Sequence, residues 1–181
     1  MVIVLNSLSD PRLVDFLNGG KIGVIPTDTI YGLAARADNP EAVAKITRLK
    51  RGGNKYRPGT VIAASVPQLV QLGIDAGIVR QVAHLWPNPL SIELPLGPNL
   101  QHLYQEGPHR AFRVVADAEL GALLEKTGPL LTSSANVHGE PAANNIEEAR
   151  KYFGSHVDFY VEGGDLSAHV PSTLAIFRDG R

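Results

Sequence analysis

Residues 19–33, GGKIGVIPTDTIYGL, decide how the rest of the chain is organised. Within this stretch, residues 22–25 form a short, mostly apolar run that is long enough for one buried strand. Pro26 ends the strand, because proline lacks the N–H that a central ladder requires. Three polar residues, 27–29, follow, and ligands in open α/β sheets bind beyond the carboxyl ends of strands. The junction therefore predicts a binding site, although Thr and Asp are also ordinary turn residues.

The composition limits the class of protein. A chain of 181 residues, 44% of them hydrophobic, is expected to form a single domain over residues 1–181. The 17 basic and 18 acidic residues give a net charge of −1, unlike the positive excess of proteins that bind nucleic acid in bulk. Cysteine is absent, which excludes disulfides, zinc–thiolate sites and a thiol nucleophile. No segment resembles a signal peptide or membrane span, so we expect a soluble, cytoplasmic protein with no membrane partner.

Apolar runs and turn-forming residues alternate along the chain in a way that predicts an α/β fold. Strands are expected at residues 1–5, 22–25, 60–64, 90–94, 111–115, 129–132, 159–161 and 173–177. Helices are expected after the capping residues Asp10, Asn39, Asp117 and the pair Asn144 and Asn145, and also at residues 67–72 and 78–85. Residues 95–108 are expected to be mostly loop. Some connections are too short for parallel crossovers, so the sheet is expected to be mixed.

Three groups of polar residues are candidates for chemistry. The first is residues 27–29 with Tyr31, the second is the basic segment at residues 50–57, and the third is Ser-Ser-Ala-Asn at residues 133–136. Each group also has an ordinary explanation. A basic helix end complements the helix dipole, and Ser, Thr, Asp and Asn are common in caps and turns. The residues alone leave both explanations open.

Arg113 stands out because it lies between Phe112 and Val114 in an expected strand. A guanidinium there needs a partner or an open cavity, so we expect Arg113 to face a ligand. The six histidines are scattered without metal-ligand spacing, and no glycine-rich phosphate loop of a standard kind is present. We therefore predict no metal held by the protein, and any phosphate would be bound by Lys, Arg, hydroxyl and loop N–H groups.

Five segments, taken together and in their order along the chain, form a recognisable set of motifs. They are K-I-G-V-I-P-T-D-T-I-Y-G-L at residues 21–33, L-W-P-N-P-L at 85–90, F-R-V at 112–114, T-S-S-A-N-V-H-G-E-P at 132–141 and P-S-T-L at 171–174. Together they resemble the signatures of the YrdC-like family, the threonylcarbamoyl-adenylate synthases (TsaC type). The resemblance runs from about Asp10 to the end of the chain. It implies a twisted, open α/β sheet flanked by helices, a double-stranded-RNA-binding-type fold with a concave, positively charged face.

The resemblance also implies a reaction. L-threonine and bicarbonate or CO2 would form a carbamate, which attacks the α-phosphate of ATP and releases pyrophosphate. Mg²⁺ would accompany the ATP, and tRNA-modification partner proteins would transfer the threonylcarbamoyl group to adenosine 37 of tRNA. Because the substrate carries the nucleophile, the protein has only to align the reactants and neutralise charge, a task that suits lysine, arginine and Mg²⁺.

By the same resemblance, individual residues acquire expected roles. Thr27 and Tyr31 would line the threonine pocket, and Ser172 or Thr173 would close it. Arg113 would hold the threonine carboxylate, which suits the guanidinium fork. The residues expected to bind ATP are Lys50, Arg51, Lys55, Arg57, Ser134, Asn136 and Asn144. Lys50 and Arg113 are the expected catalytic residues.

One segment departs from the family pattern K-x-R-x-x-x-K-P-L. Gly52 stands where the family has its arginine, and the segment is about one residue longer before its proline. Arg51 and Arg57 are the candidate replacements. The departure keeps a second hypothesis open, in which a YrdC-like protein binds double-stranded RNA or tRNA without making the adenylate. A carbamoyl-adenylate-forming domain like that of hydrogenase-maturation proteins is disfavoured, since those chains also carry zinc-finger and acylphosphatase parts.

Overall fold

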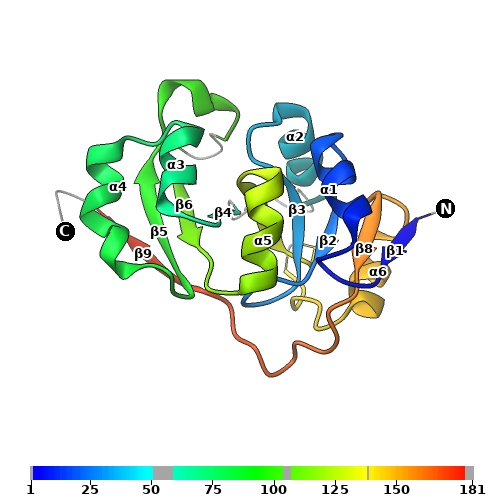
Figure 1. Cartoon of the computed structure of the whole chain (residues 1–181). Coiled ribbons are helices and arrows are strands. Elements are labelled where there is room, and N and C mark those ends of the chain that lie inside the picture. The colour runs from blue at the N-terminus through cyan, green and yellow to red at the C-terminus, as the bar shows by residue number, and fades with distance from the viewer. Residues whose placement is uncertain (1, 51–58, 104–106, 138, 178–181) are drawn as a thin grey trace.

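A single mixed β-sheet organises the molecule (Figure 1). The structure is a computed structural model that describes residues 2–50, 59–103, 107–137 and 139–177. Within these ranges nine strands lie in the order β1-β8-β2-β3-β7-β4-β6-β5-β9. They are β1 (Ile3–Leu5), β2 (Gly23–Ile25), β3 (Gly32–Arg36), β4 (Thr60–Ala63), β5 (Leu90–Pro95), β6 (His109–Val114), β7 (Leu130–Ser134), β8 (Phe159–Val161) and β9 (Thr173–Ile176). Parallel pairs such as β4–β6 stand beside antiparallel pairs such as β3–β7, which confirms the predicted mixed α/β sheet.

Most helices begin where the capping residues predict. The α-helices are α1 (Pro11–Asn18), α2 (Pro40–Lys50), α3 (Val66–Leu72), α4 (Ala76–Val82), α5 (Ala118–Thr127) and α6 (Ile146–Phe153), and the 3-10 helices are η1 (Ala83–Leu85) and η2 (Pro98–Leu103). The Asp10 side chain accepts from the N–H of Arg12, and that of Asp117 from the N–H of Leu120. Of the two asparagines before α6, Asn145 is the cap. No helix in the described ranges is long and apolar enough to cross a bilayer.

The structure differs from the sequence-based expectation in three elements. Strand β3 was not predicted, because its sequence GLAAR lacks the β-branched and aromatic residues typical of strands. It forms because it is buried between β2 and β7, with which it pairs antiparallel. Strand β7 extends through Ser134, so Ser133 and Ser134 belong to the strand and do not follow it. The expected loop at residues 95–108 contains η2.

Helices cover both faces of the sheet (Figure 1). Neighbouring residues of β3 show this arrangement, because Ala34 packs with leucines of α1 and α5 whereas Leu33 packs with residues of α2 and α6. Helices α3 and α4 bury Leu69 and Val79 against β4, β5 and β6 in a third cluster. The core therefore lies in layers on either side of the sheet.

A long connection runs from the strand next to one edge of the sheet to the opposite edge. From β8, the second strand in the order, the chain runs to β9 at the opposite edge through residues 162–172, here called the crossing strap. Figure 1 shows the strap as the orange-to-red segment that passes along one border of the molecule. It brings Pro171 and Ser172 beside residues of the central strands.

Candidate functional site

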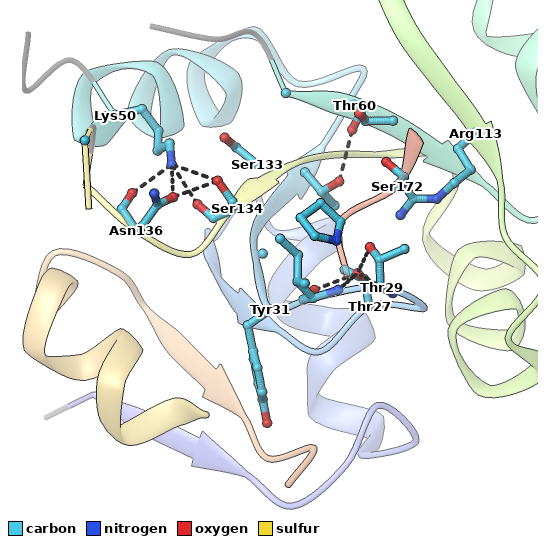
Figure 2. Close-up of a pocket in the computed structure, with 16 residues that line it drawn as sticks. Thr27, Thr29, Tyr31, Lys50, Thr60, Arg113, Ser133, Ser134, Asn136 and Ser172 are labelled. Carbon is cyan, nitrogen blue, oxygen red and sulfur yellow. Dashed lines mark hydrogen bonds between the residues drawn. The ribbon is translucent and has the colours of Figure 1, made fainter. Parts of the chain in front are cut away.

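A cavity of about 370 Å³ opens over the central strands (Figure 2). This volume lies in the range of small-molecule sites. The lining comes from β3, β4, β6, β7, the loop after β7, the end of α2, the β2–β3 turn and the crossing strap. The lining residues are Thr27, Thr29, Ile30, Tyr31, Gly32, Lys50, Gly59, Thr60, Arg113, Thr132, Ser133, Ser134, Asn136, Gly139, Pro171 and Ser172.

The alternation of side chains in β7 explains how a strand of the core also lines the cavity. Leu130 packs with the leucines of α5, and Thr132 and Ser134 share its face because side chains alternate along a strand. Thr132 lies opposite Thr60 of β4, and its hydroxyl donates to the Thr60 carbonyl at 3.1 Å. One face of β7 thus changes from apolar to hydroxyl-bearing within three residues.

Thr27 organises the turn between β2 and β3. Its hydroxyl donates to the carbonyl of Ile30 at 2.6 Å and accepts from the N–H groups of Thr29 and Ile30, each at 3.2 Å. The threonine hydroxyl thus forms hydrogen bonds with backbone groups that would otherwise need other partners in the turn, as side chains of this kind often do. The turn is fixed internally, and it presents Thr27 and Thr29 to the cavity.

Lys50, the last residue of α2, ends in a ring of oxygen atoms at one side of the cavity (Figure 2). Its Nζ lies 2.7 Å from the carbonyls of Ser134 and Asn136 and from the Asn136 Oδ1, and 3.3 Å from the Ser134 Oγ. The Ser134 hydroxyl also donates to the Asn136 Oδ1 at 2.7 Å. Lys50, Ser134 and Asn136 therefore form one hydrogen-bonded unit.

The Lys50 unit has no carboxylate. Lys50 is 5% exposed, and none of the ion pairs in the described ranges includes it. Burial lowers the pKa of Lys50 to about 8, because the charged ammonium loses its hydration. Uncharged oxygens solvate the ammonium without cancelling its charge. This side of the cavity therefore favours an anion.

Arg113 stands at the other side of the cavity (Figure 2). Its Nη2 lies 2.7 Å from Asp28 Oδ1, and the two side chains are only 4% and 7% exposed. Its Nη1 donates to the Ser91 hydroxyl at 3.2 Å, and its buried Nε has no hydrogen-bond partner among the described residues. Arg113 thus has the partner that a guanidinium inside an apolar strand was expected to need, and it also lines the cavity; that it faces a ligand stays a prediction. Asp28 offsets its charge, and the fully buried Nε–H is left unpaired among the described residues.

The structure brings together most, but not all, of the expected site residues. Seven of them line the cavity: Thr27, Tyr31, Lys50, Arg113, Ser134, Asn136 and Ser172. The side chain of Tyr31 nevertheless points away from the other labelled residues (Figure 2). Its hydroxyl donates to the Gly164 carbonyl at 3.0 Å, and burial raises the pKa of Tyr31 to about 12. Tyr31 thus holds the crossing strap with a hydroxyl that stays protonated.

Other expected residues fall elsewhere. Thr173 is exposed in β9 and is not part of the lining, so of the pair expected to close the threonine end only Ser172 lines the cavity. Asn144 is also outside the lining, because its backbone bonds to Glu148 and Leu166 before α6. Arg51, Lys55 and Arg57 lie outside the described residues.

Several polar residues at the site were not assigned a role from the sequence. Thr29, Thr60, Thr132 and Ser133 line the cavity, and Asp28 and Ser91 bond Arg113 behind it. Asp28 belongs to the Thr-Asp-Thr segment that is a candidate for chemistry, so the sequence did indicate that it lies near the site. Ser91 lies in an apolar strand segment where nothing local marks it, and its partners are distant in the sequence.

The site does not fit a metal ion held by the protein. Among the described residues that line the cavity there is no carboxylate, and no group of three or more His, Asp or Glu residues in the described ranges could hold a metal ion. Mg²⁺ prefers carboxylate and phosphate oxygens. Any Mg²⁺ in this cavity would thus arrive with the phosphates of a nucleotide, as part of the substrate.

Comparisons with known proteins show which family the sequence matches. The Sua5/YciO/YrdC family model, described as telomere recombination, matches residues 15–180. A putative threonylcarbamoyl-AMP synthase of Mycobacterium tuberculosis is 30% identical over 164 residues, which cover 89% of this chain and 75% of the relative. The threonylcarbamoyl-AMP synthase of Coxiella burnetii is also 30% identical, over 89% of this chain and 88% of its own.

Solved structures show the same fold. A variant of P. abyssi Sua5 superposes with a TM-score of 0.84 at 25% identity, over 99% of this chain. A second structure of that protein, in complex with L-threonine, gives a TM-score of 0.80 at 24% identity over 98% of this chain. The chain spans 58% and 54% of the lengths of these two Sua5 chains.

Proposed function

Because the chain belongs to the Sua5/YciO/YrdC family, we propose that it is a threonylcarbamoyl-AMP synthase that uses L-threonine, bicarbonate or CO2, and ATP. The observation that carries the proposal is that two buried cationic side chains line one cavity from opposite sides: Lys50, which pairs with no carboxylate among the described residues, and Arg113, which is paired with Asp28. Two anionic groups, a carboxylate and a phosphate, match this arrangement. Relatives named threonylcarbamoyl-AMP synthase support the assignment.

The Arg113 side is suited to the amino acid. Arg113 lines the cavity and can offer its guanidinium to a carboxylate, and the hydroxyls of Ser172 and Thr29 lie in the same lining. Hydroxyl groups bind both a carboxylate and a threonine side-chain hydroxyl. We therefore place L-threonine between Arg113, Ser172 and the Thr27 turn.

The Lys50 side is suited to phosphate. Its ammonium is held in place by Ser134 and Asn136 before any ligand binds. A group held in this way needs little rearrangement to stabilise charge that develops during reaction. We therefore place the phosphates of MgATP next to Lys50, with Ser133 and Ser134 beside them. Arg51, Lys55 and Arg57 follow Lys50 in sequence and are proposed as further phosphate contacts.

The proposed reaction needs no nucleophile from the protein. The threonine amine and CO2 form a carbamate with release of a proton. Alternatively, the amine and bicarbonate form the same carbamate with release of water. A carbamate oxygen then forms a bond to the α-phosphorus, the bond to the β-phosphate oxygen breaks, and pyrophosphate leaves with the electron pair. The protein contributes alignment of the two substrates and neutralisation of charge. The product would pass to partner proteins that modify tRNA.

Pyrophosphate release from MgATP and bicarbonate, with and without L-threonine, tests the proposal. We expect release that requires both L-threonine and bicarbonate, and D-threonine serves as the matched control. Equal release without threonine would contradict the assignment. If a folded protein releases no pyrophosphate but binds tRNA with an affinity that falls steeply with salt, the RNA-binding alternative would replace it.

A further inference from the structure

Ser91 is a buried hydroxyl that joins two parts of the proposed threonine site. It belongs to β5, is 1% exposed and lies outside the cavity lining. Its Oγ lies 3.2 Å from Arg113 Nη1 and 2.8 Å from the Ser172 Oγ. Arg113 comes from β6 and Ser172 from the end of the crossing strap, so Ser91 connects a core strand to the strap.

The direction of these hydrogen bonds follows from the chemistry of the groups. A guanidinium has donors and no acceptor, so the Ser91 oxygen must accept from Arg113. Ser91 then still has its own proton, and within the described ranges the Ser172 Oγ is the acceptor in reach. A buried hydroxyl proton without an acceptor is costly, so the favoured arrangement has Ser91 donating to Ser172.

That arrangement determines what Ser172 can do. If the Ser172 oxygen accepts from Ser91, its own proton is free to point elsewhere, and Ser172 lines the cavity. The free proton is a donor for an anion in the cavity, on the same side as Arg113. We propose that Ser91 is a positioning residue that turns the Ser172 hydroxyl into a hydrogen-bond donor for the carboxylate of the amino-acid substrate.

This inference rests on the proposed function and adds a positioning residue to it. Ser91 touches no substrate and acts through Ser172. Without Ser91, the Ser172 hydroxyl can turn away from the carboxylate, and one charge-assisted hydrogen bond to the substrate weakens. The amino-acid affinity therefore depends on a strand that does not line the site.

The test uses Ser91→Ala, Ser91→Thr and the matched control Thr127→Val in the full chain. Thr127 is also buried at 1% exposure, and its hydroxyl donates to the carbonyls of Leu123 and Gly128 at the end of α5, outside the cavity lining. We expect Ser91→Ala to raise KM for L-threonine by about tenfold, the loss of one hydrogen bond to a charged group. KM for ATP and kcat should stay within about twofold. Ser91→Thr, which keeps the hydroxyl, should restore the wild-type KM, and Thr127→Val should leave KM unchanged.

A double-mutant cycle shows whether Ser91 acts through Ser172. Adding Ser91→Ala to Ser172→Ala should then raise KM for threonine no further. Additive effects, or a Ser91→Ala variant whose KM for threonine equals that of Thr127→Val, would overturn the inference and leave the proposed function standing. If the wild-type protein shows neither threonine-dependent pyrophosphate release nor calorimetric binding of L-threonine, the proposed function is contradicted. The proposed role of Ser91 is then rejected as well.

Discussion

Lys50 is a buried cation whose protonation should couple to ligand binding. Burial lowers its pKa to about 8, and an anion placed beside the ammonium favours the charged form and raises that pKa. Above pH 8 a fraction of the unliganded protein carries a neutral Lys50, so binding of MgATP at pH 8.5 should take up protons. At pH 6.5, where Lys50 is already charged, this uptake should vanish. Titration calorimetry in two buffers of different ionisation enthalpy measures the number of protons.

Lys50→Arg is the control for proton uptake. Arginine keeps the positive charge but does not titrate in this range, so the variant should bind MgATP without uptake at pH 8.5. Uptake of the same size in wild type and Lys50→Arg would show that the protons go to another group.

Arg113 and Asp28 should behave as a coupled pair in folding. Both side chains are buried and pair at 2.7 Å, so Arg113→Met leaves a buried carboxylate without its cation. Such a loss costs about 3–5 kcal/mol of unfolding free energy, whereas replacing both partners is often much less costly. We expect Asp28→Asn combined with Arg113→Met to be clearly less destabilising than the sum of the single variants, by urea denaturation.

The exposed pair Arg36 and Asp38 provides the comparison. Their side chains are 28% and 49% exposed, so Arg36→Met should change the unfolding free energy by about 0–1 kcal/mol. Strict additivity at Arg113 and Asp28, as expected for independent sites, would contradict the coupling. It would also mean that Asp28 is not the group that offsets the charge of Arg113.

Two glycines in different elements should respond in opposite directions to replacement by alanine. At Gly59, directly before β4, a Cβ would lie 2.1 Å from the backbone oxygen of Thr132 in β7. Backbone cannot yield as a flexible side chain does, so Gly59→Ala should separate β4 from β7 and destabilise the protein by about 1–3 kcal/mol. At Gly121, inside α5, a Cβ meets nothing within 4 Å. Gly121→Ala should stabilise the helix by up to about 1 kcal/mol.

Urea denaturation of both variants, with pyrophosphate release as a second readout, checks this pair. Gly59 lines the cavity, so its variant should also lose activity, whereas Gly121→Ala should keep the wild-type rate. A Gly59→Ala variant as stable as wild type would contradict this prediction, because it would show that β4 and β7 can move apart without a loss of unfolding free energy.

Local patterns in the sequence predicted the helices and strands better than the contacts between residues that lie far apart in the sequence. The caps Asp10 and Asp117 and the stop at Pro26 act over a few residues, so the sequence reveals them directly. The ion pair of Arg113 with Asp28 joins residues 85 positions apart, and no local pattern encodes it. The convergence of Lys50 with Ser134 and Asn136 was expected only through the family resemblance. Ser91 was not identified from the sequence because its hydrogen bond to Ser172 spans 81 positions.

Ligand binding should stabilise the molecule as a whole, because the cavity draws its lining from segments that unfolding separates. Residues from the β2–β3 turn, α2, β7 and the crossing strap meet there, so the unfolded chain offers no equivalent site. A ligand at 100 times its Kd that binds only the folded state contributes about 2.7 kcal/mol. For a chain of this length each kcal/mol raises Tm by about 2–4 °C, so saturating L-threonine should raise Tm by about 5–11 °C.

D-threonine is the control for this shift, measured by scanning calorimetry at matched concentration. Arg113, Ser172 and the Thr27 turn occupy fixed positions around the cavity, so the carboxylate, amine and side chain of the mirror image cannot all reach their partners. We expect no shift above 1 °C with D-threonine, an order-of-magnitude bound of about 0.3–0.5 kcal/mol. The same shift with both enantiomers would mean that the cavity recognises only a carboxylate, and the assignment of threonine as the amino acid would fail.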